Sequence, residues 1–434
     1  MAPEMELSTH AQTALEQIEK CTSCGLCKDV CPVFALTFRE AESPRGKINL
    51  LRAVLDAKLE SAPETADVFN RCLLCYACQD ACPAGVSTEK IWISGRQTIA
   101  DEAGIPLLKS LFLKQFLTNS SLWKTALKVG AKLPGGDTTI KLKGMRFPRP
   151  SQNRLDRILP EVLEPRGKQV GRIAFFPGCM LTEVFPHIGL KAAEILAHLG
   201  YEVITPQDRV CCGAPAFNNG DMDTGRKLAQ KNLEVYSHME VDAVISPDAT
   251  CGGAFRHEYD ILFPPGSIGH SEHREFRKKV KDFGEFLLQV FSKRSDVGFK
   301  PVENVVSVHD SCHLNHLQHK ADVPRKLLSY IPELKQVESP RNELCCGFGG
   351  SYSVIFPSES KAIARRKLDF MQSSGGKTFV VGSPGCLWNL RTEAAELALD
   401  VSVVHYLELV WYSLIGAAKQ TKSPVSKESD SVAD

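Results

Sequence analysis

Short apolar segments alternate with amphipathic helical segments through the C-terminal half of the chain, and between Val170 and about Ala417 the alternation occurs twice in the same order. The apolar segments are Arg172–Phe176, Tyr201–Thr205 and Ala243–Ser246 in the first copy, and Val305–His309, Leu334–Glu338 and Thr378–Ser383 in the second. Strands that alternate with helices predict parallel α/β units. Sheets of this type place their ligand sites at the carboxyl ends of the strands.

The N-terminal region has a different pattern. In the segment SPRGKINLLRAVLDAKLES, residues 43–61, apolar residues recur every three or four positions. They are Ile48, Leu51, Val54, Leu55 and Leu59. Ser43 and Pro44 are helix-start residues, so the segment predicts a helix. Arg45, in its first turn, either contacts a bound group or a partner or is simply solvated.

The segment from Ile105 to Arg172 carries fourteen Lys or Arg and four Asp or Glu residues. Its first part, residues 105–133, mixes leucine and aromatic residues with lysines and predicts a basic amphipathic helical region. Such a region packs on its own protein, docks a partner or lies on a membrane surface. The next part, residues 134–155, is rich in glycine and proline and predicts a linker.

Sixteen cysteines fall into two groups, eight from Cys21 to Cys82 and eight from Cys179 to Cys386. The N-terminus shows neither a basic nor an apolar signal region, so we expect a cytoplasmic protein with reduced thiols, or one peripheral on the inner face of the cytoplasmic membrane. Clustered cysteines in that setting indicate metal or redox chemistry rather than disulfides.

The first group forms two runs, CTSCGLCKDVCP and CLLCYACQDACP, which share the spacing C-x2-C-x2-C-x3-C-P. In this iron–sulfur spacing three cysteines bind one cluster and the fourth reaches the other cluster. The predicted sets are Cys21, Cys24, Cys27 and Cys82 for one 4Fe-4S cluster, and Cys72, Cys75, Cys78 and Cys31 for the second.

The second group is itself duplicated, with the spacings C-x31-CC-x38-C and C-x32-CC-x39-C. The cysteines of the two copies are Cys179, Cys211, Cys212 and Cys251, and Cys312, Cys345, Cys346 and Cys386. Each follows soon after a predicted strand, so the thiols of one copy can converge at one edge of a sheet. Adjacent thiols such as Cys345 and Cys346 reach one site only if the backbone leaves the strand conformation, which the following glycines permit.

Composition and the motifs that the sequence lacks exclude several classes of function. The net charge of +1 gives no general attraction to nucleic acid, and no run of 18 apolar residues predicts a transmembrane helix. No dinucleotide fingerprint follows a predicted strand, and no flavin-binding region is recognisable. The chain is therefore predicted to pass electrons, because splitting a hydride into single electrons requires a flavin or a similar cofactor.

The order of two ferredoxin runs and two CCG units resembles a known family. The N-terminal part is similar to the α-helical ferredoxin domain, and the C-terminal part to the tandem CCG cysteine-rich domain of heterodisulfide reductase and the anaerobic glycerol-3-phosphate dehydrogenase small subunit. The whole chain is most similar to glycolate oxidase iron–sulfur subunits. The matching stretches include SPRGKINL, FFPGCM, HDSCHL, CCGFGGSYS and SPGCLWNL.

The resemblance implies an electron-transfer subunit of a 2-hydroxy-acid oxidoreductase, with no activity alone. Its partner is an FAD-containing dehydrogenase subunit that oxidises glycolate or lactate, and a quinone or another carrier accepts the electrons. The alternative is a heterodisulfide-reductase-like subunit that reduces a disulfide at the CCG site. A third hypothesis is that the cysteines of the CCG repeats bind zinc in a purely structural role.

The CCG pattern of the wider family ends in C-x2-C, but here Ala254 and Asn389 stand at the second position. Four thiolates per copy suit a 4Fe-4S cluster or zinc, so one or two further metal centres are expected besides the two ferredoxin clusters. For His309 and His313 we predict hydrogen-bonding roles around the site rather than ligation.

The predicted organisation therefore has five parts. They are residues 1–100, the ferredoxin domain; 101–168, the basic helical segment and linker; 169–290 and 291–417, the two CCG repeats; and 418–434, a disordered tail.

Overall fold

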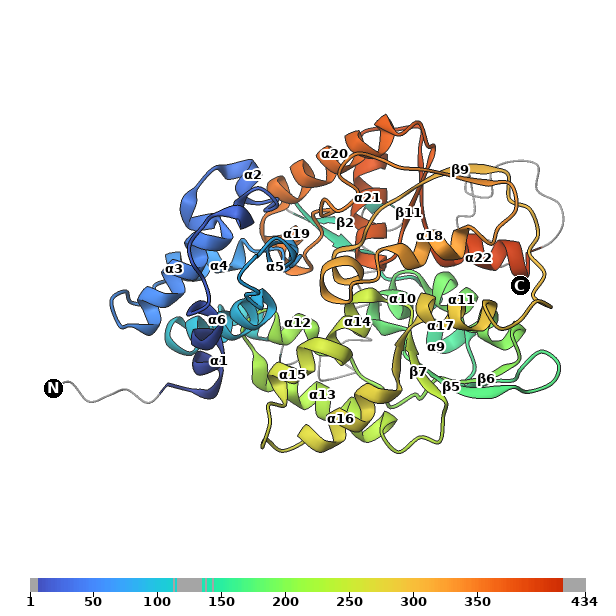
Figure 1. The fold of residues 1–434 in the computed structure, drawn as a ribbon, viewed down its shortest axis with the longest axis horizontal. Helices are drawn as coiled ribbons and strands as arrows, with labels where there is room; N and C mark the ends of the chain where they lie inside the picture. The colour runs from blue at the N-terminus through green and yellow to red at the C-terminus, as the bar shows by residue number, and fades with distance from the viewer. Residues whose placement is uncertain (1–6, 112–113, 115–134, 137–138, 143, 417–434) are drawn as a thin grey trace.

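The computed structural model describes residues 7–111, 114, 135–136, 139–142 and 144–416, which form a helical N-terminal domain followed by an α/β region (Figure 1). This confirms the predicted fold class. The basic segment between residues 115 and 133 and the C-terminal tail lie outside the described residues, and the expectations for them stay predictions.

The N-terminal domain consists of helices and tight turns among the described residues. Its elements are α1 (Thr9–Ile18), η1 (Leu26–Lys28), α2 (Phe34–Thr37), η2 (Glu40–Glu42), α3 (Pro44–Leu55), α4 (Pro63–Asn70), α5 (Ala77–Asp80) and α6 (Thr88–Ala103). Helix α1 packs along α6. Buried side chains of α1, α3, α4 and α6 share one core.

Helix α3 begins as its sequence predicts, because the hydroxyl of Ser43 accepts a hydrogen bond from the backbone N–H of Gly46 at 2.9 Å. Its end was predicted too late. The helix stops at Leu55, Ala57 has a left-handed φ of 54°, and Leu59 is 39% exposed. The apolar periodicity extended past the point where the backbone turns.

The two cysteine-rich repeats form two parallel sheets with the same strand order. The first contains β5 (Gly171–Phe175), β6 (Tyr201–Ile204), β7 (Ala243–Ser246) and β8 (Val280–Asp282), and the second β9 (Asn304–Val308), β10 (Leu334–Val337), β11 (Thr378–Val381) and β12 (Ser402–His405). The order is β6-β5-β7-β8 in one and β10-β9-β11-β12 in the other. A short antiparallel strand, β4 (Val162–Leu163), adds to the edge of the first sheet.

Helices link and cover these strands. Those before and within the first repeat are α9 (Leu155–Ile158), α10 (Gly178–Glu183), α11 (Pro186–His198), α12 (Ala214–Phe217), α13 (Met222–Tyr236), α14 (Ala249–Gly253), η4 (Ala254–Glu258), α15 (Tyr259–Leu262), α16 (His270–Lys279) and α17 (Phe283–Phe291). The second repeat has η5 (His313–Leu317), α18 (Asp322–Leu328), α19 (Ser351–Ile355), α20 (Pro357–Ser373), α21 (Pro384–Glu396) and α22 (Tyr406–Leu414).

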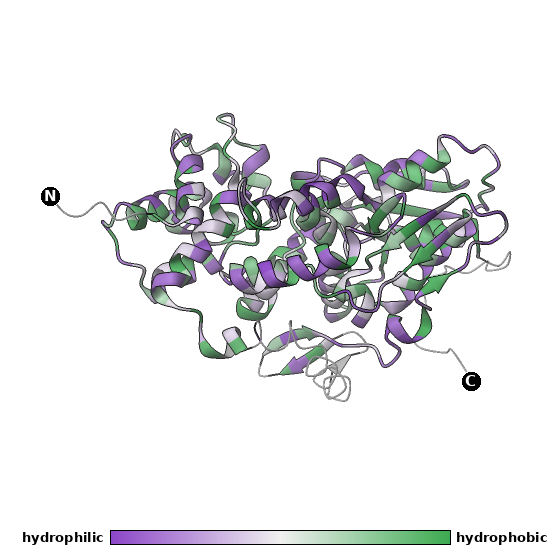
Figure 2. Ribbon diagram, turned by 90° about the horizontal axis from the view of Figure 1, so that it is seen from below, coloured by the Kyte–Doolittle hydropathy of each residue, from purple (hydrophilic) through white to green (hydrophobic). Residues whose placement is uncertain are grey.

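A single apolar core joins the repeats. It contains residues of both sheets, such as Ile173 and Val306, and of helices α17 and α22, such as Phe283 and Leu407. Figure 2 shows the hydrophobic residues gathered on the strands of the α/β region. Because the core is shared, the repeats form one folded body.

Part of the predicted linker is instead a docked structure. A short helix, α7 (Leu107–Leu111), precedes a small antiparallel sheet of β1 (Gly135–Gly136), β2 (Thr139–Leu142) and β3 (Met145–Pro148). Arg146 of β3 is 1% exposed and donates to Glu393 of α21 at 2.7 Å. Glycine and proline content predicted a linker here, but this buried ion pair fixes the segment on the second repeat.

The N-terminal domain lies against both repeats. Arg71 at the end of α4 donates to Glu359 of α20 at 2.7 Å, and Tyr76 donates to Glu258 of η4 at 2.6 Å. These contacts hold the second cysteine run against the α/β region, and Cys31 and Cys75 share an apolar cluster with Cys312 and Cys345.

Candidate metal centres

The first predicted cluster set converges. Cys21, Cys24, Cys27 and Cys82 all line one cavity, although Cys82 belongs to the second run; Cys78 of the second set also borders this cavity. Arg45 lines the same cavity and donates to the carbonyl of Ser23 at 3.2 Å. Of the two readings of Arg45, contact with the cluster region therefore fits the geometry.

The second set, Cys31, Cys72, Cys75 and Cys78, is more deeply enclosed. Burial raises the pKa of the Cys31 thiol to about 12, and the thiols of Cys75 and Cys72 add to this effect. The pKa of Cys78 is raised well above its usual value, first by burial and then by Cys75, Cys72 and Cys31. Close thiols that are costly to ionise, such as those of Cys31 and Cys78, suit a cationic iron centre, which stabilises thiolates.

The two runs share a backbone conformation. Ser23 and Gly25 in the first run, and Leu74 and Tyr76 in the second, occupy matching positions and all have positive φ, at 57°, 89°, 53° and 60°. A non-glycine residue in this region costs about 1–2 kcal/mol. The second run has two such residues, Leu74 and Tyr76, so contacts with the rest of the protein must stabilise its backbone.

Arg96 of α6 provides such contacts for the second run. Its guanidinium donates to the carbonyl oxygens of Phe69 at 2.8 Å and Cys72 at 2.7 Å, and to that of Asn218 in the first repeat. The side chain is buried. Arg96 therefore ties the loop that carries Cys72 to the α/β region.

Tyr76, in the same run, is fixed by contacts with residues of both repeats. Its hydroxyl donates to Glu258, its ring stacks on His313 with centroids 5.4 Å apart, and His313 hydrogen-bonds to the carbonyl of Leu74 at 3.1 Å. This agrees with the hydrogen-bonding role predicted for His313. Burial raises the pKa of Glu258 to about 7, although the Tyr76 hydroxyl acts in the opposite direction.

Glu258 gives the protein a pH-dependent stability. Because its folded pKa lies above the value of 4.5 expected in the unfolded chain, its contribution is complete below about pH 4.5 and is lost as the pH rises towards 7. Glu258→Gln removes the ionisation. We expect the variant to gain up to ~3 kcal/mol relative to the wild type between pH 5 and pH 8. Anaerobic thermal melts across this range measure the gain, and parallel curves for the two proteins would contradict it.

In the first repeat the four cysteines form a chain of interacting thiols. Cys179 in α10 follows β5, Cys211 and Cys212 follow β6, and Cys251 in α14 follows β7. Hydrogen bonds link Cys179 with Cys211, Cys211 with Cys212, and Cys212 with Cys251. Asn232 donates to the carbonyl of Cys211 at 3.0 Å, and Tyr259 to that of Cys212 at 2.8 Å.

The second repeat places its cysteines at the equivalent strand ends. Cys312 follows β9, Cys345 and Cys346 follow β10, and Cys386 lies at the start of α21 after β11. The sulfur atoms of Cys346 and Cys386 are 3.0 Å apart. The glycine after each cysteine pair has a left-handed φ, 89° at Gly213 and 82° at Gly347, which allows the paired thiols to leave the strand conformation.

The second repeat meets the N-terminal domain through its thiols. A hydrogen bond to Cys345 and burial raise the pKa of the Cys75 thiol well above its usual value, and Cys345 also hydrogen-bonds with Cys312. Cys312 and Cys345 share an apolar cluster with Val33 and Leu73 of the N-terminal domain. The second ferredoxin set and the second CCG set are therefore direct neighbours.

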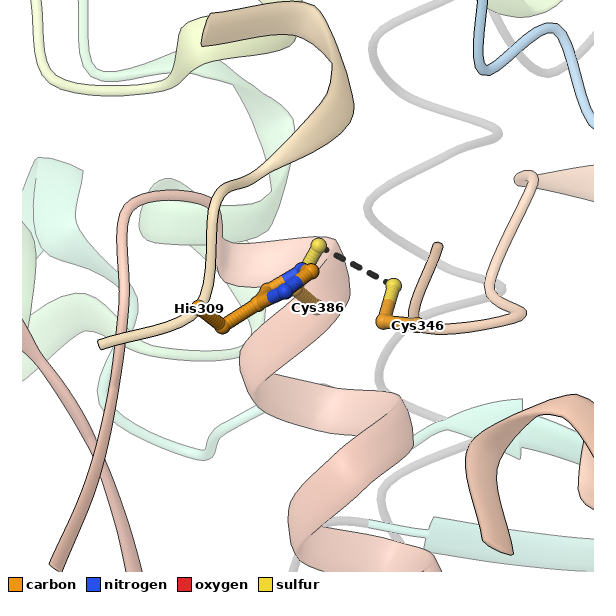
Figure 3. A group of neighbouring side chains, drawn as sticks. All are labelled: His309, Cys346 and Cys386. Carbon is orange, nitrogen blue, oxygen red and sulfur yellow. Dashed lines mark hydrogen bonds between the residues drawn. The ribbon is translucent and has the colours of Figure 1, made fainter. Parts of the chain in front are cut away.

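His309 lies beside the thiols of the second CCG repeat, a position that the sequence did not predict. A ring nitrogen of His309 and the sulfur atoms of Cys346 and Cys386 all lie within 4.8 Å of one another (Figure 3). Burial, assisted by the cation of Lys367, lowers the pKa of His309 well below its usual value. One feature of the sequence could have indicated this role. Three positions before the first cysteine of each repeat, the second repeat has His309 where the first repeat has Phe176.

The residues at the shortened end of each motif are buried and are not donors to the sites. Ala254 is apolar. Asn389 donates to the carbonyl of Cys346 at 2.8 Å and accepts from Arg146 at 3.3 Å. The side chain at the position of the missing cysteine in the second repeat thus holds the backbone of the cysteine pair.

Comparisons with known proteins agree with this architecture. A 4Fe-4S dicluster domain matches residues 17–86, and a cysteine-rich CCG domain matches residues 173–256 and 306–391. The chain is 28% identical to the probable glycolate oxidase iron–sulfur subunit of Bacillus subtilis over 91% of this chain and 93% of that protein. It is 26% identical to the glycolate oxidase iron–sulfur subunit of Escherichia coli over 95% and 98%. It is also 30% identical to lactate utilization protein A of Macrococcus caseolyticus over 55% of this chain and 96% of that protein.

The fold and the cysteine sets define an iron–sulfur protein in which a dicluster domain is joined to tandem cysteine-rich domains. Within that class, the chain belongs to the family of glycolate oxidase iron–sulfur subunit-like proteins. Two of these relatives are named as iron–sulfur subunits of glycolate oxidase, so electron transfer is the activity implied for the family.

In the described part of the chain, no helix combines the length and the apolar character that a bilayer span requires.

Proposed function

We propose that this chain is the iron–sulfur electron-transfer subunit of a flavin-dependent glycolate or lactate dehydrogenase complex. It would receive electrons from an FAD-containing subunit and deliver them to a quinone or another carrier. The observation that carries this proposal is the contact between Cys75 and Cys345, which makes the second ferredoxin set and the thiol set of the second repeat direct neighbours. The similarity to glycolate oxidase and lactate utilization proteins supports the choice of substrate class.

The residues present fit the implied groups. Cys21, Cys24, Cys27 and Cys82 would hold one 4Fe-4S cluster, and Cys31, Cys72, Cys75 and Cys78 the second. The eight cysteines of the two repeats would hold one or two further iron–sulfur or zinc centres. Iron–sulfur clusters supply one-electron transfer when bound.

The protein surroundings favour metal-bound thiolates that are shielded from water. Cys312, Cys345, Cys346 and Cys386 are each less than 9% exposed. Lys47 is 2% exposed, and its positive charge favours the ionised form of Cys31. Arg96 fixes the carbonyl of Cys72, so the loop keeps its shape while charge on the site changes.

Disulfide reduction at the CCG sites is the weaker alternative. The wider family pattern has a fifth cysteine at the position of Asn389. Here the amide of Asn389 donates a hydrogen bond to the carbonyl of Cys346 instead. We expect the hydroxy acid to be oxidised on another chain, because that step needs a flavin or a similar cofactor and no flavin-binding region is recognisable in this sequence. We propose a cytoplasmic location, either free or peripheral on the inner face of the membrane.

The test compares the anaerobically purified chain, alone and with the FAD subunit that co-purifies with it. We expect no dye reduction with glycolate or lactate when the chain is alone, and turnover when the flavoprotein is added. Turnover by the chain alone would refute the proposal. Cys345→Ser should slow electron delivery to the final acceptor, but the reduction of the flavin by substrate should remain.

A further inference from the structure

His309 is a buried polar residue without a partner. It follows β9, and its backbone N–H donates to the carbonyl of Val380 in β11 at 2.8 Å, which fixes the position of the residue. The side chain is 1% exposed, and neither ring nitrogen makes a hydrogen bond of ordinary geometry among the described residues; the backbone of Asn342 acts on the ring only by raising its pKa. Leaving such a group unsatisfied costs about 1–3 kcal/mol, so a binding partner is expected.

The imidazole of His309 faces the thiols of Cys346 and Cys386 in the second repeat. A ring nitrogen lies within 4.8 Å of the sulfur atoms of Cys346 and Cys386, and these sulfurs are 3.0 Å apart (Figure 3). Metal–sulfur bonds of ~2.3 Å and metal–nitrogen bonds of ~2.0 Å place tetrahedral ligand atoms roughly 3.3–3.8 Å from one another. The three donor atoms therefore need only small shifts to share one metal ion.

We propose that His309 is a nitrogen ligand of the metal centre in the second repeat. This centre would then have mixed cysteine and histidine ligands, whereas the centre of the first repeat would have cysteine ligands. The inference rests on the second repeat binding metal, which is part of the proposed function. The close spacing of the three donors is that of a single ion such as zinc; in an iron–sulfur centre, whose irons each take their own ligand, His309 would bind one iron.

The first repeat lacks this nitrogen. Phe176 stands at the equivalent position, three residues before Cys179, and its ring packs on Phe255 with centroids 4.7 Å apart. The other polar candidate in the second repeat is Asn389, but both ends of its amide already have partners. His309 thus offers a nitrogen donor in one repeat only.

The asymmetry has a chemical consequence. A neutral imidazole in place of a thiolate leaves less negative charge on an iron–sulfur centre, and histidine ligation is known to raise the reduction potential of such centres. The second repeat also touches the ferredoxin set through Cys345. The centre with the higher potential would therefore be the one next to the ferredoxin clusters.

The test uses the full-length protein, purified anaerobically and labelled with 15N-histidine. If the second centre is iron–sulfur, pulsed EPR should detect a strong nitrogen coupling whose pattern changes on labelling. If metal analysis finds zinc instead, zinc X-ray absorption should show one nitrogen beside sulfur ligands. A weak coupling typical of an N–H···S hydrogen bond, or an all-sulfur zinc shell, would overturn the proposal.

Variants assign the nitrogen to one residue. His309→Gln should lose the nitrogen signal, and His309→Cys should lose it while retaining the metal, because a thiolate replaces the imidazole. His273→Gln is the matched control, since His273 is a buried histidine of the first repeat that bonds to the carbonyl of Phe255. Persistence of the signal in His309→Cys would overturn the assignment. Metal sufficient only for the two ferredoxin clusters would overturn both this inference and the metal sites proposed in the repeats.

Discussion

Changing Cys82 to serine should abolish the same EPR signal that is lost when Cys24 is changed to serine. Cys82 belongs to the second cysteine run, yet it lines the cavity of Cys21, Cys24 and Cys27. Its loss should therefore destabilise the cluster of the first run and remove up to about half of the iron held by the N-terminal domain. EPR of the reduced protein and iron analysis measure the two effects.

The reciprocal variant is the control. Cys31→Ser should abolish the signal that Cys75→Ser abolishes, because Cys31 lies with the second set. If each run instead bound its own cluster with four consecutive cysteines, Cys82→Ser would match Cys75→Ser. That result would overturn the exchange of the fourth ligands.

Replacing Arg96 with methionine should cost about 3 kcal/mol of folding stability or more. The variant keeps an apolar stem but leaves the carbonyl oxygens of Cys72 and Asn218 without this donor, whereas that of Phe69 still accepts from the backbone N–H of Cys72. Each buried polar group that loses its partner costs about 1–3 kcal/mol. Anaerobic thermal unfolding should show a lower Tm, with earlier bleaching of iron–sulfur absorbance.

Arg172→Met provides a matched comparison. Arg172 also donates to a carboxylate and a carbonyl, but its side chain is 45% exposed. Water can replace those bonds, so a loss below about 1 kcal/mol is expected. Equal losses in the two variants would show that Arg96 does not act through its buried carbonyl partners.

The sequence predicted the features that depend on local spacing. Two identical cysteine runs predicted the dicluster domain, and two similar CCG spacings predicted the repeated α/β units with cysteines at the carboxyl ends of strands. These features are readable because tight loops and strand ends are set by residues near one another in the chain. The helix at residues 44–55 was found for the same reason, and only its end was misplaced.

Features that depend on packing between distant segments were not predictable. The contact of Cys75 with Cys345 arises because the N-terminal domain docks on the second repeat. Residues 139–142 and 145–148 form strands in a segment that Arg146 ties to Glu393, far along the chain, whereas their composition alone indicated a linker. His309 was assigned a supporting role because four cysteines already completed a ligand set, and its missing hydrogen-bond partners are visible only in the folded protein.

The contact between Cys75 and Cys345 also bears on how the protein is made. Both thiols are enclosed where the N-terminal domain covers the second repeat, so iron and sulfide must reach them before that surface closes. Chains fold domain by domain from the N-terminus during synthesis. We therefore expect cofactor insertion to set the order of maturation, with the N-terminal domain loaded first and its docking on the second repeat as the last step.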